Sequence, residues 1–129
     1  MKTSILIFVF LLAAVPASAC GDGALAENLA ATPAVKAGLA DAYRAAHRHA
    51  PANGPRSGHT WYGRLGDFEY AVATFDGRQG VFTRHRAKRW LLAFEARGAV
   101  CDPVVPAQLL ARAWWWHPAR AGCFLEPGS

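Results

Sequence analysis

Short motifs that carry common catalytic chemistries are missing from this chain. Its 129 residues include no Gly-x-Ser-x-Gly nucleophile turn, no glycine-rich phosphate loop, no Cys-x-x-Cys and no His-Glu-x-x-His. Two of the five histidines, His47 and His49, are so spaced that on a helix they point about 200° apart. They therefore do not share a metal ion, and we expect neither a metal site nor a cofactor.

Isolated residues that resemble parts of catalytic sites have simpler interpretations. Cys101-Asp102 would act as a nucleophile only with a reduced thiol of depressed pKa and a positioned base. Glu69 and Glu95 fall within predicted strands, where carboxylates usually face solvent. We therefore expect a protein without enzymatic activity. The alternative is a small hydrolase, which requires a pocket that brings together two of four side chains, His59, Glu69, His85 and Glu95.

Acidic residues are fewer than basic ones, but the imbalance is small. The chain has 14 Lys and Arg against 9 Asp and Glu, a formal net charge of +5 at pH 7. A charge of this size is too small to indicate nucleic-acid binding. It favours anionic surfaces such as phospholipid or anionic wall polymer, so we expect one of these as a partner and no nucleic acid.

Long apolar runs are scarce as well, and the only one covers residues 5–15. Lys2 precedes it, Pro16 follows it, and Ala17-Ser18-Ala19 gives the small-x-small pattern that signal peptidases cleave. The run is shorter than the roughly 20 apolar residues that span a bilayer. The pattern predicts a signal peptide over residues 1–19 and an exported protein, with a retained membrane anchor as the alternative.

Cysteine occurs three times, as Cys20, Cys101 and Cys123. Residues 17–20 resemble a bacterial lipoprotein signal, in which the cysteine after the cleavage site is acylated. The resemblance implies a lipid anchor at Cys20 on the outer face of the cell membrane, whereas ordinary cleavage would leave a secreted protein. Acylation leaves Cys101 and Cys123 to pair in an oxidising compartment, with two buried free thiols as the alternative. This bond would stabilise the fold by about 3 kcal/mol.

After the signal, the sequence predicts a tether and then a helix. Residues 20–32 are rich in Ala, Gly and Asn, and we expect a flexible tether there. Thr32-Pro33 is a helix start, because Thr caps free backbone N–H groups and Pro fits the first turn. From Val35 to Ala46, apolar residues recur at helical spacing, which predicts an amphipathic helix that ends near His49.

A strand pattern follows the helix. Alternating apolar residues and turn dipeptides such as Asp76-Gly77 predict four strands, at residues 59–63, 68–75, 81–84 and 89–96. Their short links favour an antiparallel meander. Pro106 opens a short helix that stops before Pro118. The expected fold class is α+β, with the N-terminal amphipathic helix packed on the four-stranded antiparallel meander and a short C-terminal helix, in one domain over residues 33–129.

A basic segment is the first candidate binding feature. Residues 84–89 carry five basic side chains in six positions. At a hairpin turn, Arg84, Arg86, Lys88 and Arg89 would project toward phosphates on lipid or wall polymer. The alternative interpretation is a soluble turn whose charges protect a sheet edge.

The tryptophan triplet 114–116 is the second candidate binding feature. On a helix these side chains point 100° apart, so all three do not face one core. Trp115 falls on the polar side with Arg112, which predicts that it is exposed or stacked on that guanidinium. Packing under the C-terminal tail is the alternative.

Several short runs resemble a group of small exported actinobacterial proteins of unknown function. The resembling runs are Thr60–Gly63, Tyr70–Phe75, Val81–Thr83, Val100–Cys101, Val104–Pro106 and Leu109–Leu110. This likeness covers roughly residues 34–116 and implies no particular activity. We therefore expect an exported, lipid-anchored, non-catalytic binding or interaction module of the cell envelope, whose partner is an anionic lipid, a wall polymer or an envelope protein.

Overall fold

The computed structural model of the protein describes residues 25–48, 54–101, 104–120 and 122–128. The elements are β1 (Glu27–Leu29), α1 (Pro33–Ala46), β2 (Thr60–Leu65), β3 (Phe68–Phe75), β4 (Arg78–His85), β5 (Leu91–Ala96), β6 (Val100–Cys101), η2 (Gln108–Ala113), β7 (His117–Arg120) and β8 (Cys123–Leu125). They form a five-stranded antiparallel sheet in the order β1-β2-β3-β4-β5 and a three-stranded sheet in the order β6-β8-β7. The predicted α+β class is confirmed.

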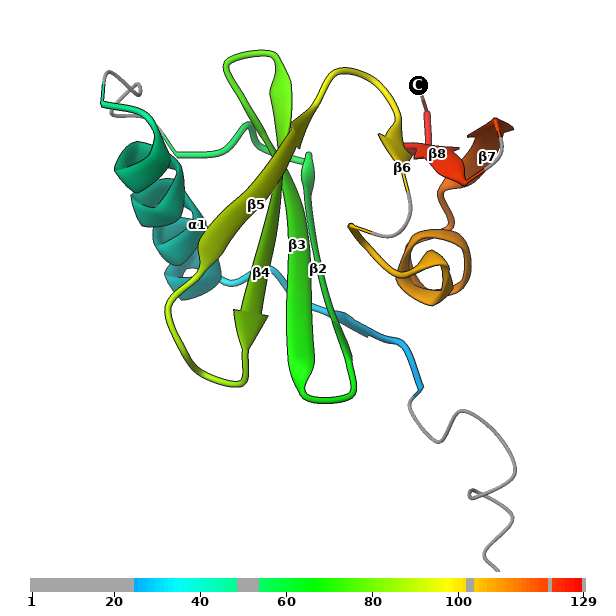
Figure 1. Cartoon of the computed structure of the whole chain (residues 1–129), viewed down its shortest axis with the longest axis horizontal. Coiled ribbons are helices and arrows are strands. Elements are labelled where there is room, and N and C mark those ends of the chain that lie inside the picture. Colours follow the sequence, from blue (N-terminus) through cyan, green and yellow to red (C-terminus); the bar gives the residue numbers. More distant parts are fainter. Residues whose placement is uncertain (1–24, 49–53, 102–103, 121, 129) are drawn as a thin grey trace, which may run out of the picture.

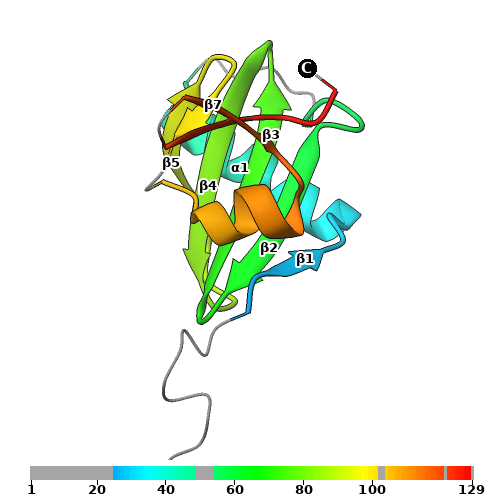
Figure 2. The ribbon, with the colours of Figure 1, turned by 90° about the vertical axis from the view of Figure 1, so that its right-hand side faces the viewer.

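The two faces of the large sheet are covered by different parts of the chain. α1 lies against one face, and η2 with the small sheet lies on the other (Figure 1). Figure 2 shows η2 and β7 in front of the sheet, with α1 behind it. Within the described ranges, no helix is long and apolar enough to cross a membrane.

α1 starts where the sequence predicts. Thr32 Oγ1 accepts a hydrogen bond from the backbone N–H of Val35 at 3.2 Å, and the proline after Thr32 occupies the first helical turn. The helix ends at Ala46, slightly before its predicted end. Leu39 and Tyr43 are buried against the sheet, so the amphipathic stripe read from the sequence is the face that packs.

Strands β2 to β5 follow one another as antiparallel neighbours, as the short links predict. Asp76 and Gly77 join β3 to β4 with φ angles of 48° and 75°. Positive φ at both central residues is the geometry of the tight turn that matches strand twist, which explains the Asp-Gly pair. β4 is longer than predicted and reaches His85, whereas β5 begins only at Leu91.

One strand lies where the sequence predicts a flexible tether. β1 pairs antiparallel with β2, with Leu29 opposite Tyr62, and Glu27 forms an ion pair with Arg64 at 3.7 Å. The tether prediction is therefore wrong over β1, because the free edge of β2 supplies hydrogen-bond partners for a strand too short to have a readable pattern. Residues 20–24 of that tether, the predicted signal peptide and Cys20 lie outside the described residues.

β3 divides its side chains between two hydrophobic cores. Ala71, Ala73 and Phe75 face α1 and pack with Leu39 and its neighbours. Val72 points the opposite way, into the core beneath η2. This period of two is the geometry of a strand, and because both faces are covered, the strand is apolar at nearly every position.

The C-terminal segment differs from the predicted helix in form. η2 is a π-helical turn over Gln108–Ala113, in place of an α-helix that continues through the tryptophans. The Trp114 N–H bonds to the Leu109 carbonyl five residues back, at 2.8 Å. Trp115 then adopts a φ of 60°, a left-handed conformation that stops helical geometry.

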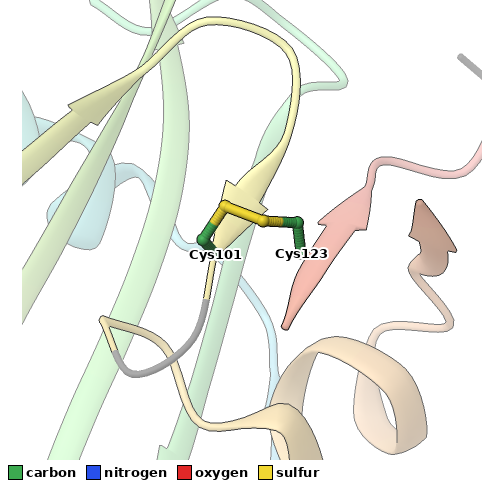
Figure 3. Close-up of a disulfide and its surroundings, with 2 residues drawn as sticks. All are labelled: Cys101 and Cys123. Atoms are coloured by element: carbon green, nitrogen blue, oxygen red, sulfur yellow. A yellow bond between two sulfur atoms is a disulfide. The ribbon is translucent and has the colours of Figure 1, made fainter. Parts of the chain in front are cut away.

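The predicted disulfide between Cys101 and Cys123 is confirmed (Figure 3). The two residues lie opposite each other in β6 and β8, with Cα atoms 3.9 Å apart. The bond ties the C-terminal tail to the segment that follows β5. Both cysteines belong to the small sheet, so the bond joins two of its strands and closes a covalent loop that contains η2 and β7.

Candidate functional site

A buried acidic side chain, Glu69 on β3, accepts hydrogen bonds from side chains of the two neighbouring strands. Only 6% of the residue is exposed. Arg84 lies opposite on β4, and its Nε and Nη2 donate to the two carboxylate oxygens at 2.6 and 3.2 Å. The hydroxyl of Tyr62 on β2 donates to the same carboxylate. Three adjacent strands thus build one hydrogen-bonded group on the sheet face that α1 covers.

Burial and hydrogen bonding oppose each other in setting the charge of this group. Burial would raise the pKa of Glu69, but the hydrogen bonds from Arg84 and Tyr62 together lower it below its ordinary value. The bond to Glu69 raises the pKa of Arg84, and burial raises that of Tyr62. At neutral pH the group therefore holds a carboxylate, a guanidinium and a neutral phenol. A carboxylate with a lowered pKa is poorly suited to take up a proton near neutral pH.

Trp90 connects these residues to α1. The guanidinium carbon of Arg84 lies 4.4 Å from the centre of the Trp90 ring, and the Tyr62 ring meets that ring edge-on at 5.7 Å. The indole also lies close to Gly38 of α1, where an added Cβ would be 2.8 Å from Trp90 Cδ1. We call Tyr62, Glu69, Arg84 and Trp90 the Glu69 cluster. It fixes the position of the connection between β4 and β5 against the helix.

A pocket of about 640 Å³ lies between α1 and the β4–β5 connection, and we call it the α1 pocket. Its lining comprises Gly38, Asp41, Ala42, Ala45, Ala46, Arg84, Ala87, Lys88, Arg89, Trp90, Leu91 and Leu92. The helix contributes mainly small side chains, the β4–β5 connection contributes Trp90, and β5 contributes two leucines. Pockets of about 300–1,000 Å³ with mostly apolar walls and a few polar groups are typical of small-molecule sites.

The prediction that Arg84 projects into solvent is wrong. Because β4 continues to His85, Arg84 falls two positions after the buried Phe82 and on the same sheet face. Its side chain is only 20% exposed and is bound to Glu69. Arg84 therefore acts as part of the wall of the α1 pocket and not as a surface cation.

The other three cations of the basic segment are exposed, as predicted. Arg86 forms an exposed ion pair with Asp67 at 3.5 Å, and this pairing reduces what Arg86 adds to the net positive charge of the segment. Lys88 and Arg89 line the α1 pocket and have no ion-pair partner among the residues that the structure describes. These two carry the uncompensated positive charge of the segment.

A second pocket, of about 530 Å³, shares Arg84 and Ala87 with the lining of the α1 pocket. Its lining comprises Tyr62, Arg64, Gly66, Asp67, Glu69, Arg84, Arg86 and Ala87. Each of its three arginines pairs with a carboxylate. Because these charges largely cancel, this pocket is a weaker candidate for an anionic ligand than the α1 pocket.

The middle residue of the tryptophan triplet is exposed as predicted, although the triplet follows the end of η2 and does not lie on a helix. Trp115 is 75% exposed, while Trp114 and Trp116 are buried. Both buried rings meet Trp61 of β2, at centroid distances of 6.4 and 6.0 Å. Trp115 follows η2 in the chain, and η2 lies on the opposite side of the large sheet from α1 (Figure 1). The structure therefore does not unite the two predicted binding features in one surface.

The side chains that a hydrolase pocket would combine are each bound to a different neighbour. His59 contacts Glu126, and Glu69 is bound by Arg84. The ring of His85 lies against Phe68, and Glu95 contacts His47. Neither pocket described above contains two of the four. In the described part of the chain, no group of three His, Cys, Asp or Glu side chains is arranged to hold a metal ion.

Glu126 is an anchor of the C-terminal tail that sequence reasoning missed. Its Oε1 accepts a hydrogen bond from Trp61 Nε1 at 2.9 Å and lies 3.0 Å from His59 Nδ1. The partners are more than 60 positions apart, so no local pattern indicates the contact. For Glu69 a signal did exist, because it alternates with Ala71 and thus falls on a covered face of β3.

Comparisons of the chain with protein-family models, with curated proteins and with solved structures found no match. The protein is therefore described by its own structural features. It is a small disulfide-bonded α+β domain with a mostly apolar pocket beside its helix and two uncompensated cations in that pocket's lining.

Proposed function

We propose that the chain is an exported, non-catalytic binding module of the cell envelope that binds the phosphate groups of anionic lipid through Lys88 and Arg89. The observation that carries this proposal is the position of these two exposed cations beside the apolar walls of the α1 pocket. A soluble wall polymer would make no use of apolar walls, whereas a lipid surface presents phosphate and hydrocarbon together. This combination favours lipid over wall polymer or an envelope protein.

The expected size of the effect follows from the number of free charges. A Lys or Arg near an anionic membrane contributes about 1 kcal/mol, so Lys88 and Arg89 together contribute about 2 kcal/mol, or about 30-fold in affinity. A lipid anchor at Cys20 would add to this, since stable attachment to a membrane generally takes two signals. In this proposal the acylated cysteine is the first signal and the basic residues are the second.

The test is binding of the purified protein to vesicles with and without anionic phospholipid. Lys88→Gln/Arg89→Gln should weaken the preference for anionic vesicles about 30-fold, because it removes both uncompensated charges. Binding to neutral vesicles should not change, so any contribution of an acyl anchor cancels in the comparison. Sedimentation of vesicles at several lipid concentrations measures both affinities.

The matched control is Arg112→Gln/Arg120→Gln, which removes two exposed cations away from the α1 pocket. We expect this variant to retain most of the preference for anionic vesicles. Equal losses in the two double variants would show that binding follows net charge alone, and would refute a site at Lys88 and Arg89.

The proposed export and anchor are tested separately. Mass spectrometry of the N-terminus of the protein recovered from cells should find a chain that begins at Cys20 and carries acyl groups. An unmodified Cys20 would exclude the lipid anchor and leave a secreted protein. Export itself is tested by the presence of the disulfide-bonded product outside the cytoplasm.

A further inference from the structure

We infer that the α1 pocket accepts the alkyl chain of an anionic single-chain amphiphile whose head group binds Lys88 and Arg89. This inference rests on the proposed function and specifies its ligand, since it requires the hydrocarbon chain as well as the anionic group. Free phosphate or a lipid head group alone would then bind much more weakly than the complete amphiphile.

The walls of the pocket match hydrocarbon. Ala42, Ala45 and Ala46 on one side, and Leu92 on the other, have no side-chain hydrogen-bond donors or acceptors. A sugar or a peptide backbone placed between them would lose hydrogen bonds to water without replacement, which is costly. An alkyl chain has no such groups and gains free energy in proportion to the apolar surface removed from water.

Part of this apolar wall is exposed to solvent in the described structure. Ala45 and Ala46 are exposed on α1, and Leu92 is only partly buried on the facing strand. An alkyl chain that lies between these alanines and Leu92 would cover the exposed part of all three side chains. Covering exposed aliphatic surface next to a formed pocket is the usual arrangement of a small apolar ligand.

The charge in the pocket lining selects an anionic head group. Arg84 is neutralised by Glu69, and Asp41 pairs with Arg44 at 3.1 Å. The two remaining charged residues of the lining, Lys88 and Arg89, are both positive. They come from one end of the β4–β5 connection, so a carboxylate or phosphate there would leave the helix wall free for the chain.

The experiment is calorimetric titration of the purified protein, in the form recovered from cells, with laurate below its critical micelle concentration. Acetate and inorganic phosphate serve as probes that carry the anionic group without the chain. We expect laurate to bind at least 100-fold more tightly than either. Contacts in nuclear Overhauser spectra between laurate methylenes and the methyl groups of Ala42 and Ala46 should place the chain in the pocket.

Ala45→Trp fills the pocket from an exposed helical position and should weaken laurate binding at least tenfold. Ala37→Trp is the matched control, since Ala37 is exposed on α1 and does not line the pocket. It should leave laurate affinity within twofold of wild type. Thermal unfolding of both variants separates loss of the pocket from loss of the fold, and the Overhauser contacts of the wild type provide a test that needs no variant.

The outcomes separate this inference from the proposed function. Laurate binding that is unaffected by Ala45→Trp, or equal to acetate binding, overturns the pocket as a chain site. If the wild type also retains its preference for anionic vesicles, the proposed function stands without a chain site. If neither laurate nor anionic vesicles bind, both are overturned.

Discussion

Replacement of Arg84 by methionine tests whether the buried carboxylate of Glu69 depends on the guanidinium that it meets. Methionine keeps an unbranched stem over Trp90 but removes both hydrogen bonds from Arg84 to Glu69. Tyr62 would then be the remaining donor of the Glu69 cluster. Removal of one member of a buried ion pair typically costs about 3–5 kcal/mol, because the other charge stays buried without compensation.

The measurements are urea-induced and thermal unfolding at neutral pH, both followed by circular dichroism. For a domain of this size, a loss of about 3–5 kcal/mol lowers the midpoint of thermal unfolding by roughly 15–30 °C. The double variant Glu69→Gln/Arg84→Met should recover at least half of this loss, since no charge remains buried. Arg86→Met removes an exposed cation paired with Asp67 and should change stability by at most about 1 kcal/mol.

The pH dependence supplies a second readout of the same change. In the wild type the pKa of Glu69 is lowered, so its contribution to stability is present above the ordinary carboxyl pKa and is lost as the pH falls through the folded value. In Arg84→Met, the hydrogen bonds that lower the pKa of Glu69 are fewer, while burial still raises it. The pKa of Glu69 therefore rises, and protonation now favours the folded state. The difference in stability between the two proteins should therefore narrow between about pH 5 and pH 3.

Two results would contradict this reasoning. One is an Arg84→Met variant within about 1 kcal/mol of the wild type at neutral pH, which would mean that Glu69 needs no guanidinium. The other is a large loss that stays constant from neutral to acidic pH. A constant loss would point to packing against Trp90 and not to the charge of Glu69.

Three further predictions concern the scaffold. Cys101→Ala/Cys123→Ala should lower the free energy of unfolding by about 3 kcal/mol, measured in urea, and an unchanged midpoint would show that the bond adds nothing. Gly38→Ala should cost about 1–3 kcal/mol and alter the near-ultraviolet circular dichroism, because its Cβ would meet Trp90 Cδ1 at 2.8 Å; a spectrum identical to wild type would refute this close approach. Trp115→Gly should keep or raise stability by up to about 1 kcal/mol, since glycine adopts a φ of 60° without strain, and should remove the most red-shifted part of the tryptophan emission. A loss above about 1 kcal/mol would show that Trp115 packs against the fold.

The elements that the sequence predicts correctly are those with strong local patterns. α1 has a Thr-Pro start and an apolar stripe, and β3 has eight residues that alternate between two covered faces. β1, β6, β7 and β8 have two to four residues each, which is too few for a periodic pattern. They exist because a strand edge elsewhere in the chain, or the disulfide, holds them in place, so they depend on tertiary context.

The candidate site shows the same division between local and tertiary information. The basic segment is visible in the sequence, but its cations look equivalent there. Because β4 ends at His85, Arg84 belongs to the strand and faces the helix. Lys88 and Arg89 follow the strand and are exposed to solvent. The α1 pocket is not visible in the sequence, because it forms only when small residues of α1 come to lie beside the β4–β5 connection.

The bond between Cys101 and Cys123 also determines how the protein responds to a protease. Every peptide bond between Cys101 and Cys123 lies inside the covalent ring that this bond closes, including those of β7, whose residues are all exposed. A single cut at Arg120 would therefore leave one covalent molecule with the same mass plus one water. The two fragments would separate on a gel only after reduction, so a nicked protein would pass for an intact one under oxidising conditions.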